Sequence, residues 1–440
     1  MNIMSLNNWA AQLNFVSSAI QWKRAVKAKN EEEAVIPTVT SPSSPSQFSG
    51  HPGASYGLNS ALAARGVIVE DKVFLNLNAS ELKQKGATTT ESLSGLHIYF
   101  RGTVFGGSSE FSKSQFSKLL KQVTSHLSSI PDIFIHDGAI GSSSRCSARI
   151  RVISDNPSAV LSLSDILWGA SNRAVSHDTC PITIYVASSI SETIGSTVGI
   201  GSQGSTGFIA ADTERSSLIL CGNAFGDTNG VKRSLVALSE PILAARGGIP
   251  LAARILELED VVILLFAPED VIWSSSNQLV SGDAGVILAS QGVAPFFRTK
   301  KSNAPSLYKL PAAIILACSD SSKVLPAVSR LSPGQAAYHF LAGYQNGNYI
   351  PAFNSRLSSI DPLELSKALL AQLKDTSMIP FLININDGEK HITGKDLIDV
   401  VQSTLSKNIS FFKPKGGDLK SKFKRFLRSK YSELPEEFSF

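Results

Sequence analysis

The stretch that decides the fold reads Leu325-Pro326-Ala327-Val328-Ser329-Arg330-Leu331, followed after six residues by Tyr338-His339-Phe340-Leu341-Ala342-Gly343-Tyr344. It comes after the apolar run Ile314–Cys318, and similar short runs recur along the chain. The other runs are Val73–Leu77, Ile133–His136, Ile150–Ile153, Ile182–Val186, Leu218–Cys221, Val261–Phe266 and Phe381–Ile385. Between several of them lie segments long enough for helices, among them Ser112–Leu127, Pro362–Lys374 and Thr393–Leu405. Short strands that alternate with helices predict an α/β protein.

The composition is that of a folded, water-soluble protein. The chain has 440 residues, of which 43% are hydrophobic and 18% charged, and this length suggests two or three domains. Its apolar runs are far shorter than the ~20 residues that a membrane-spanning helix needs. The net charge of +5 is spread over 41 basic and 36 acidic residues, so bulk charge gives no reason to expect nucleic-acid binding.

Cysteine usage predicts a reducing compartment, and hence a cytoplasmic protein. Cys146, Cys180, Cys221 and Cys318 lie 34, 41 and 97 residues apart, a spacing that fits neither a metal-binding pair nor a disulfide framework. We interpret them as small buried apolar residues.

The two ends of the chain differ from its middle. Residues 1–57 begin with thirty residues that contain no Asp or Glu and form a basic, amphipathic pattern, which fits either a helix packed on the protein or a mitochondrial transit peptide. Pro37–Tyr56 is rich in Pro, Ser and Gly and predicts a flexible linker. Residues 411–440 contain a predicted basic helix, Asp418–Tyr431, with one apolar stripe. The basic faces of the terminal helices could contact a protein partner, or they could be solvated faces above an apolar seam.

Three glycine-rich matches to functional motifs have the wrong context. Gly199, Gly201 and Gly204 satisfy the dinucleotide pattern but lie in a Ser/Gly loop, and Gly53–Gly57 satisfies the nucleophile-elbow pattern but follows the linker. Gly388–Asp396 resembles a phosphate loop with one residue too many, and we interpret Thr393 as a helix N-cap. The pairs His136-Asp137 and His177-Asp178 are interpreted as structural.

The stretch quoted first resembles the ATP-dependent phosphoenolpyruvate carboxykinases, which carry a similar LPPVS-K/R-L and YHF segment. The likeness extends backward through Ile314–Asp320 and forward through Phe381–Asn384. Fainter likenesses lie at Leu75–Leu82, Arg149–Ser154 and Leu218–Gly222. The resemblance covers about Val73 to Leu405 and implies that family's two-domain α/β fold. Residues 58–241 would form the N-terminal domain and residues 242–410 a shortened relative of the nucleotide domain.

The family converts oxaloacetate and ATP to phosphoenolpyruvate, carbon dioxide and ADP in gluconeogenesis, with Mg²⁺ and Mn²⁺. In the family, a strand like Val261–Phe266 leads into the phosphate loop GLSGTGKTT, but here Ala267, Pro268, Glu269 and Asp270 follow. Two carboxylates at ~4 Å from a phosphate would each add up to ~4 kcal/mol of repulsion at an effective dielectric constant of about 20. We therefore expect that ATP does not bind there in the family's manner.

Other positions that the resemblance assigns to substrate or metal have also changed. A Mn²⁺-binding Lys falls on Arg233 beside Lys232, a Tyr falls on Phe225, and a metal-binding His falls near Arg246. Asp283 matches an Asp that binds the second metal, and Arg101 matches an arginine that binds substrate. We expect a remnant pocket for a small dicarboxylate or phosphate, built from Arg101, Lys232, Arg233 and Arg246.

Three functional hypotheses follow from the resemblance and its departures. The chain is a catalytically degenerate member with a binding or regulatory role and no cofactor, or an active carboxykinase that uses ATP with Mg²⁺ and Mn²⁺. The third hypothesis is a nucleotide-independent enzyme that acts on a small dicarboxylate.

Overall fold

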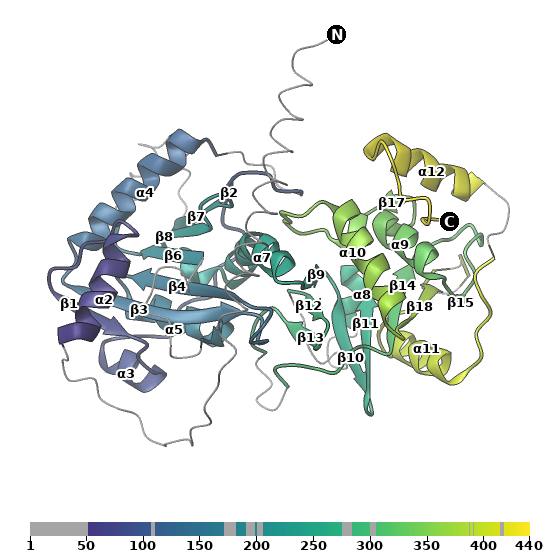
Figure 1. The fold of residues 1–440 in the computed structure, drawn as a ribbon, viewed down its shortest axis with the longest axis horizontal. Helices are drawn as coiled ribbons and strands as arrows, with labels where there is room; N and C mark the ends of the chain where they lie inside the picture. Colours follow the sequence, from purple (N-terminus) through teal and green to yellow (C-terminus); the bar gives the residue numbers. More distant parts are fainter. Residues whose placement is uncertain are drawn as a thin grey trace, which may run out of the picture. The chain divides into compact units, whose positions relative to one another are not determined.

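A computed structural model describes residues 52–106, 111–170, 182–190, 199, 206–274, 284–299, 305–386, 388–389, 391–413 and 418–440. The chain divides into residues 1–56 and one compact unit, Gly57–Phe440 (Figure 1). The amphipathic start and most of the predicted linker lie outside the described residues. Helix α2 (Pro52–Ala63) begins inside that linker, so the linker prediction is wrong for residues 52–56.

The first half of the compact unit is built on an eight-stranded mixed sheet in the order β1-β3-β4-β6-β8-β7-β2, with β5 paired to β3. β4, β6 and β8 run parallel to one another, and β7 returns antiparallel to β8. The strands are β1 (Lys72–Leu75), β2 (Ile98–Arg101), β3 (Asp132–Ile140), β4 (Ala148–Ser154), β5 (Trp168–Gly169), β6 (Ile182–Ala187), β7 (Gly207–Asp212) and β8 (Ser217–Gly222).

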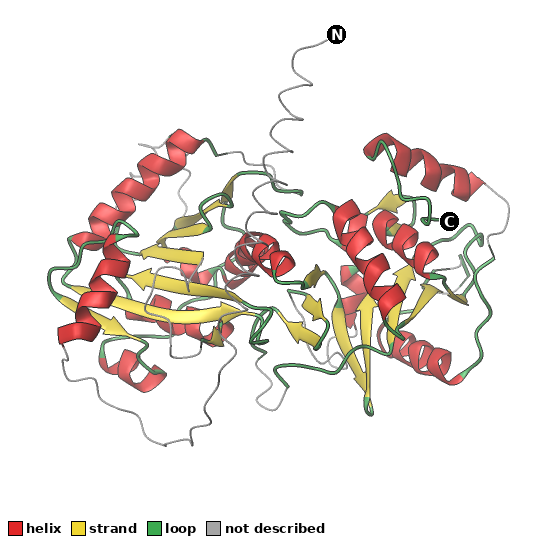
Figure 2. Cartoon of the chain, in the orientation of Figure 1, coloured by secondary structure: helices red, strands yellow, loops and turns green. Residues whose placement is uncertain are grey.

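Helices cover both faces of this sheet (Figure 2). Alternate residues of β6 enter two cores, with Ile184 on one face and Tyr185 on the other, as the two-residue period of a strand requires. α2 and α4 contribute to the core that holds Tyr185, and α5 and α7 to the core that holds Ile184. The remaining helices are α3 (Ala79–Gln84), α4 (Lys113–Ser128), α5 (Pro157–Ile166), η2 (Asn223–Gly226) and α7 (Thr228–Ala245).

The second half contains a five-stranded sheet in the order β10-β11-β14-β18-β15, whose strands β11, β14 and β18 are parallel. Smaller sheets join β13-β12-β9 and β16-β17. The strands are β9 (Ile249–Leu251), β10 (Arg254–Leu258), β11 (Val261–Phe266), β12 (Val286–Ala289), β13 (Gly292–Pro295), β14 (Ala313–Cys318), β15 (Val328–Arg330), β16 (Tyr344–Gln345), β17 (Asn348–Tyr349) and β18 (Ile379–Asn384). The helices are α8 (Glu269–Ser274), α9 (Pro333–Ala342), η3 (Pro351–Phe353), α10 (Pro362–Asp375), α11 (Gly394–Ser406) and α12 (Asp418–Lys430).

The α/β prediction is confirmed, because every apolar run named above overlaps a strand and the three predicted helical segments match α4, α10 and α11. No described helix is both long enough and apolar enough to cross a lipid bilayer.

The predicted domain boundary at Pro241 falls inside α7. Proline has no N–H, so the carbonyl of Ala237, four residues earlier, loses its helical partner. The Ser359 hydroxyl donates to that carbonyl at 2.6 Å. The neighbouring Glu240 carboxylate, which is buried, accepts from the Ser358 hydroxyl and the Ser359 backbone N–H at 2.8 Å each. The carbonyl that the proline leaves without a helical partner is therefore bonded by the segment around Ser359, and the domain boundary stays a prediction.

Glu240→Gln should flatten the dependence of stability on pH. Burial raises the pKa of Glu240 to about 7, against the opposing hydrogen bonds from Ser358 and Ser359. A carboxyl whose folded pKa is raised is fully stabilising only below its unfolded pKa, and that stability is lost as the pH rises toward 7. The loss would amount to about 3 kcal/mol. Urea unfolding at pH 5 and pH 8 should show a larger drop for the wild type than for the Gln variant, and equal drops would contradict this account.

The predicted C-terminal helix is present as α12, and its apolar stripe is buried. Phe423 lies at the centre of an aromatic cluster, with its ring centroid 5.0 Å from both Tyr344 and Phe440 and 5.5 Å from His339. Burial lowers the pKa of His339 to about 3, so its ring is neutral. The helix thus covers α9, which carries the second half of the stretch quoted at the start of the sequence analysis. A partner for its exposed basic face stays a prediction.

Phe423→Ala should lower the free energy of unfolding by about 3–5 kcal/mol, because it removes a fully buried ring. Lys424→Ala changes the exposed face of the same helix and should shift it by less than about 0.5 kcal/mol. A small effect of Phe423→Ala in denaturant unfolding would show that α12 is not part of the core.

Candidate functional site

The carboxyl ends of β11, β14 and β18 meet at one edge of the second sheet, where open α/β sheets bind their ligands. Asp320 follows β14, and its carboxylate accepts from the backbone N–H groups of Val324 and Leu325 at 3.0 and 2.8 Å. The Asn384 amide, at the end of β18, accepts from the Asp320 N–H at 2.9 Å and donates to the Asp320 carbonyl at 2.9 Å. These contacts hold the loop that leads into the fold-deciding stretch.

Beyond β11, the chain forms the short helix α8 in place of a glycine-rich loop. Val271 is completely buried and joins the core beneath β11 and β14, while Glu269 and Asp270 are exposed in the first turn of the helix. The Glu269 carboxylate accepts from the Ser355 hydroxyl at 3.1 Å. Carboxylates in a first turn compensate the positive end of the helix dipole, so this end is already matched by negative charge from the chain itself.

The turn at Gly388–Asp396 packs against the same helix. Thr393 is the N-cap residue of α11, as predicted, but its side chain makes no capping hydrogen bond. Instead, the Ser274 hydroxyl at the end of α8 accepts from the Gly394 N–H at 3.0 Å. The expected cap is therefore supplied by a residue 120 positions away, which sequence reasoning missed.

Arg101 is paired with two carboxylates of the fold itself. It is 8% exposed and forms an ion pair with Asp212 at 2.5 Å and a second pair with Glu214. The hydrogen bond that Arg101 donates to Asp212 raises the pKa of Arg101. Its positive charge is therefore balanced within the fold.

The structure does not bring together the four basic residues of the predicted anion pocket. Arg101 is level with Asp212, which pairs with Ser217 at the start of β8, whereas α7 begins beyond the end of β8. The length of β8 alone is about 16 Å. On α7, Arg233 is exposed. Arg246 lies 13 positions later, so the two arginines are about 20 Å apart along the helix axis. Arg246 donates to the Ser147 carbonyl. The Lys232 ammonium lies 5.7 Å from the centre of the Phe297 ring.

The metal prediction cannot be placed, since Asp283 lies outside the described residues. Among the residues that are described, no group of three or more His, Cys, Asp or Glu side chains is positioned to hold a metal ion. Cys146, Cys221 and Cys318 are buried free thiols, and Cys180 is not described.

The remaining sequence motifs find structural roles where they are described. Asp137 accepts two hydrogen bonds of 2.7 Å from Arg151, and burial lowers the pKa of His136, so this pair is structural as predicted. Gly53–Gly57 lies in the helix α2. His177, Asp178, Gly201 and Gly204 lie outside the described residues.

A serine, a histidine and an aspartate meet at the carboxyl ends of β4 and β6, which sequence reasoning missed. His126 Nε2 lies 3.2 Å from Asp155 and 3.1 Å from the Ser189 hydroxyl. A catalytic relay uses different ring nitrogens for the serine and the carboxylate, whereas here the same nitrogen faces both. Burial raises the pKa of Asp155. The hydrogen bonds from Ser189 and Ser188 outweigh this effect and hold the pKa below its ordinary value. The cluster is a carboxylate that fixes a loop.

Comparison with known proteins identifies the relatives. A family model described as phosphoenolpyruvate carboxykinase matches residues 282–347, which include β12, β14 and α9. The chain resembles the ATP-dependent phosphoenolpyruvate carboxykinases. The phosphoenolpyruvate carboxykinase (ATP) of Flavobacterium johnsoniae is 25% identical over 130 residues, which are 26% of this chain and 24% of that protein.

Two further relatives carry the same name. The phosphoenolpyruvate carboxykinase (ATP) of Bradyrhizobium sp. (strain ORS 278) is 26% identical over 170 residues, which are 31% of this chain and 32% of that protein. That of Parvibaculum lavamentivorans is 34% identical over 77 residues, 17% of this chain and 14% of that protein. The chain therefore matches less than a third of the length of each of these carboxykinases. The predicted resemblance and the carboxykinase-like α/β fold are confirmed.

Replacing Arg101 should destabilise the protein strongly. Arg101→Met leaves the fully buried Asp212 carboxylate without this cation, at an expected cost of about 3–5 kcal/mol. Adding Asp212→Asn should recover part of the loss, while Arg233→Met, on the exposed face of α7, should change stability by less than about 0.5 kcal/mol. Equal unfolding midpoints for Arg101→Met and Arg233→Met would refute the structural role of Arg101.

Proposed function

We propose that this chain is a catalytically degenerate relative of the phosphoenolpyruvate carboxykinases (ATP), with a binding or regulatory role in place of carboxykinase activity. The supporting observation is the way β11 ends. It runs through Pro268 into a helix whose first turn carries Glu269 and Asp270.

The residues at this edge do not fit a nucleoside triphosphate. A phosphate-binding turn needs several converging backbone N–H groups and a cation for the β- and γ-phosphates. Here Pro268 has no N–H, and residues 267–274 contain no lysine or arginine. Hydrogen bonds to charged groups contribute about 1.5–3 kcal/mol each, so the loss of three or four is comparable with the ~8 kcal/mol of a micromolar complex.

The ion pairing of Arg101 supports the same proposal on the substrate side. A dicarboxylate would have to displace Asp212 and Glu214, which are already bonded to this guanidinium. Asp212 is fully buried, and its loss as a partner would leave a charge without compensation. Arg233, the exposed arginine of α7, is about 20 Å along the helix axis from Arg246, so these two arginines do not act on one ligand.

Nucleotide titration against thermal stability tests this proposal. Mg-ATP at 100 times its Kd would stabilise a native-state binder by about 2.7 kcal/mol, which moves the melting temperature by several degrees. We expect a shift below about 1 °C at millimolar Mg-ATP, while the Flavobacterium johnsoniae carboxykinase serves as the positive control.

A coupled assay completes the test. We expect no phosphoenolpyruvate from oxaloacetate and Mg-ATP above the rate of a heat-inactivated sample. Formation of phosphoenolpyruvate that depends on both substrates would overturn the proposal in favour of an active carboxykinase. Turnover of oxaloacetate without nucleotide would overturn it in favour of a nucleotide-independent enzyme.

A further inference from the structure

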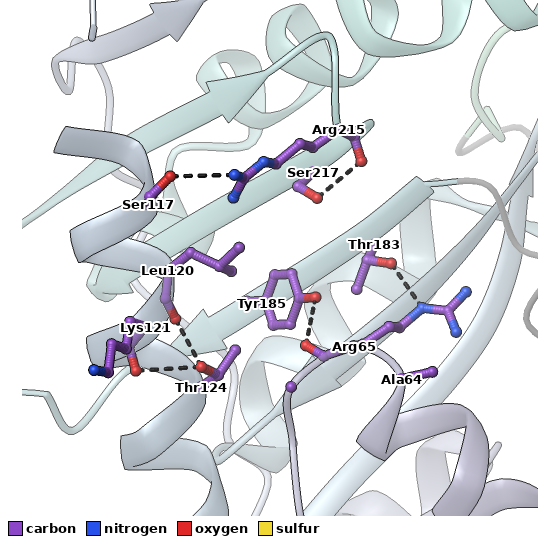
Figure 3. Close-up of a pocket in the computed structure, with 11 residues that line it drawn as sticks. Ala64, Arg65, Ser117, Leu120, Lys121, Thr124, Thr183, Tyr185, Arg215 and Ser217 are labelled. Carbon is purple, nitrogen blue, oxygen red and sulfur yellow. Dashed lines mark hydrogen bonds between the residues drawn. The ribbon is translucent and has the colours of Figure 1, made fainter. Parts of the chain in front are cut away.

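A pocket of about 500 Å³ lies on the face of the first sheet that α2 and α4 cover. Eleven residues line it, from the end of α2, one side of α4, β6 and the turn between β7 and β8 (Figure 3). The pocket lies beside the first residues of β6 and β8, the opposite end of the sheet from the start of α7. Its volume is within the range of about 300–1,000 Å³ that is typical of small-molecule sites.

The lining of this pocket is one-sided in charge. It includes the three cations Arg65, Lys121 and Arg215 and five hydroxyl side chains, and none of the lining residues is a carboxylate. The nearest ion pair joins Arg215 Nε to Asp212 at 3.7 Å, and Asp212 is already bonded to Arg101. Among the described residues, the carboxylates paired with these cations and with Arg101 are Asp212 and Glu214, and the lining itself carries only positive charge.

Arg65 is held in place by the backbone of the turn that carries it. α2 ends with the Val67 N–H bonded to the Leu62 carbonyl and the Gly66 N–H bonded to the Ala63 carbonyl, and Gly66 has φ +81°, which is the pattern of a Schellman motif. The Tyr185 hydroxyl donates to the Arg65 carbonyl at 3.0 Å. Arg65 is 8% exposed, its Nε donates to the Thr183 hydroxyl at 2.9 Å, and its Nη1 donates to the Ala61 carbonyl at 3.1 Å.

Arg215 approaches the pocket from the other side. Its Nη2 donates to the Ser117 hydroxyl of α4 at 3.2 Å, and its side chain is 39% exposed (Figure 3). Burial raises the pKa of Tyr185 to about 12, while the charges of Arg65 and Arg215 both oppose the rise. Both cations therefore act on the same phenol, which lies between them.

Two of the five hydroxyls complete a set of donors, since those of Thr124, Tyr185 and Ser217 already donate to backbone carbonyls. The oxygens of Thr183 and Ser117 each accept from an arginine, and a hydroxyl that accepts from a cation is a better donor of its own proton. Guanidinium groups and hydroxyls around a dianion are the usual recognition chemistry of phosphate. Leu120 and Ala64 add an apolar wall that an inorganic phosphate alone would not use.

We propose that this pocket binds a small phosphomonoester, with its phosphate between Arg215 and Arg65 and its organic part toward Leu120. This site is separate from the β11 edge, so it stands whether or not the chain has lost carboxykinase activity.

Calorimetric titration with inorganic phosphate and with phenyl phosphate, at constant ionic strength set by NaCl, tests the proposal. We expect saturable binding of both, with the tighter affinity for phenyl phosphate. Arg215→Gln and Lys121→Gln should each weaken binding of phenyl phosphate by about tenfold, as expected for the loss of one charge-assisted contact. The matched control is Lys118→Gln, an exposed lysine of α4 that does not line the pocket, which should stay within about twofold of the wild type.

Two outcomes would overturn the proposal. The first is that neither probe binds the wild type saturably. The second is that Lys118→Gln and Arg215→Gln lose affinity equally, because an equal loss indicates that the probes are attracted by surface charge in general. Each variant should melt within about 2 °C of the wild type, and Lys121→Gln keeps the test valid if Arg215→Gln disturbs Asp212. Repeating the Mg-ATP titration on Arg215→Gln separates this pocket from the β11 edge. A thermal shift that persists in this variant arises outside the pocket.

Discussion

A parallel strand inside a sheet has to be covered by side chains on both faces, and this constraint organises the compact unit. β6 and β14 are buried along their whole length, and β8 and β18 along all but one residue each. Each sheet therefore needs two helical layers, and the chain supplies them up to its last residue, Phe440, which packs on Phe423 of α12.

The same constraint explains which elements can be predicted from the sequence. A strand buried on both faces reads as a continuous apolar run, and Ile314–Cys318 and Val261–Phe266 were recognisable for that reason. The edge strand β2 was missed, because its last residue is the charged Arg101. The continuation of α7 through Pro241 was not predicted, since the hydroxyl that bonds the carbonyl of Ala237 lies 122 residues later. A local pattern does not contain such a contact.

The candidate sites divide in the same way. The altered turn at Pro268, Glu269 and Asp270 is contiguous, so its change of charge is readable from the sequence. The role of Arg101 depends on Asp212, which lies 111 residues away and becomes its neighbour only through the register of β2 and β7. The pocket around Arg65 and Arg215 has no motif at all, because separate segments contribute its residues. Arg101 lies between two carboxylates, whereas Arg65 donates to a hydroxyl and Arg215 contacts both a hydroxyl and the Asp212 carboxylate, and only the fold decides these surroundings.

Under the proposed function, the helix α8 suggests how a carboxykinase-like fold can persist with a different turn after β11. A phosphate-binding loop is built from glycines, which pack no side chains and carry a high conformational entropy in the unfolded chain. In α8 the corresponding turn inserts Val271 completely into the core below β11, and Ser274 binds the first N–H of α11. Both changes add contacts to the sheet where a functional loop would leave backbone exposed for a ligand. Relief from binding nucleotide would remove the selection against such contacts, since active sites are commonly less stable than the fold could allow.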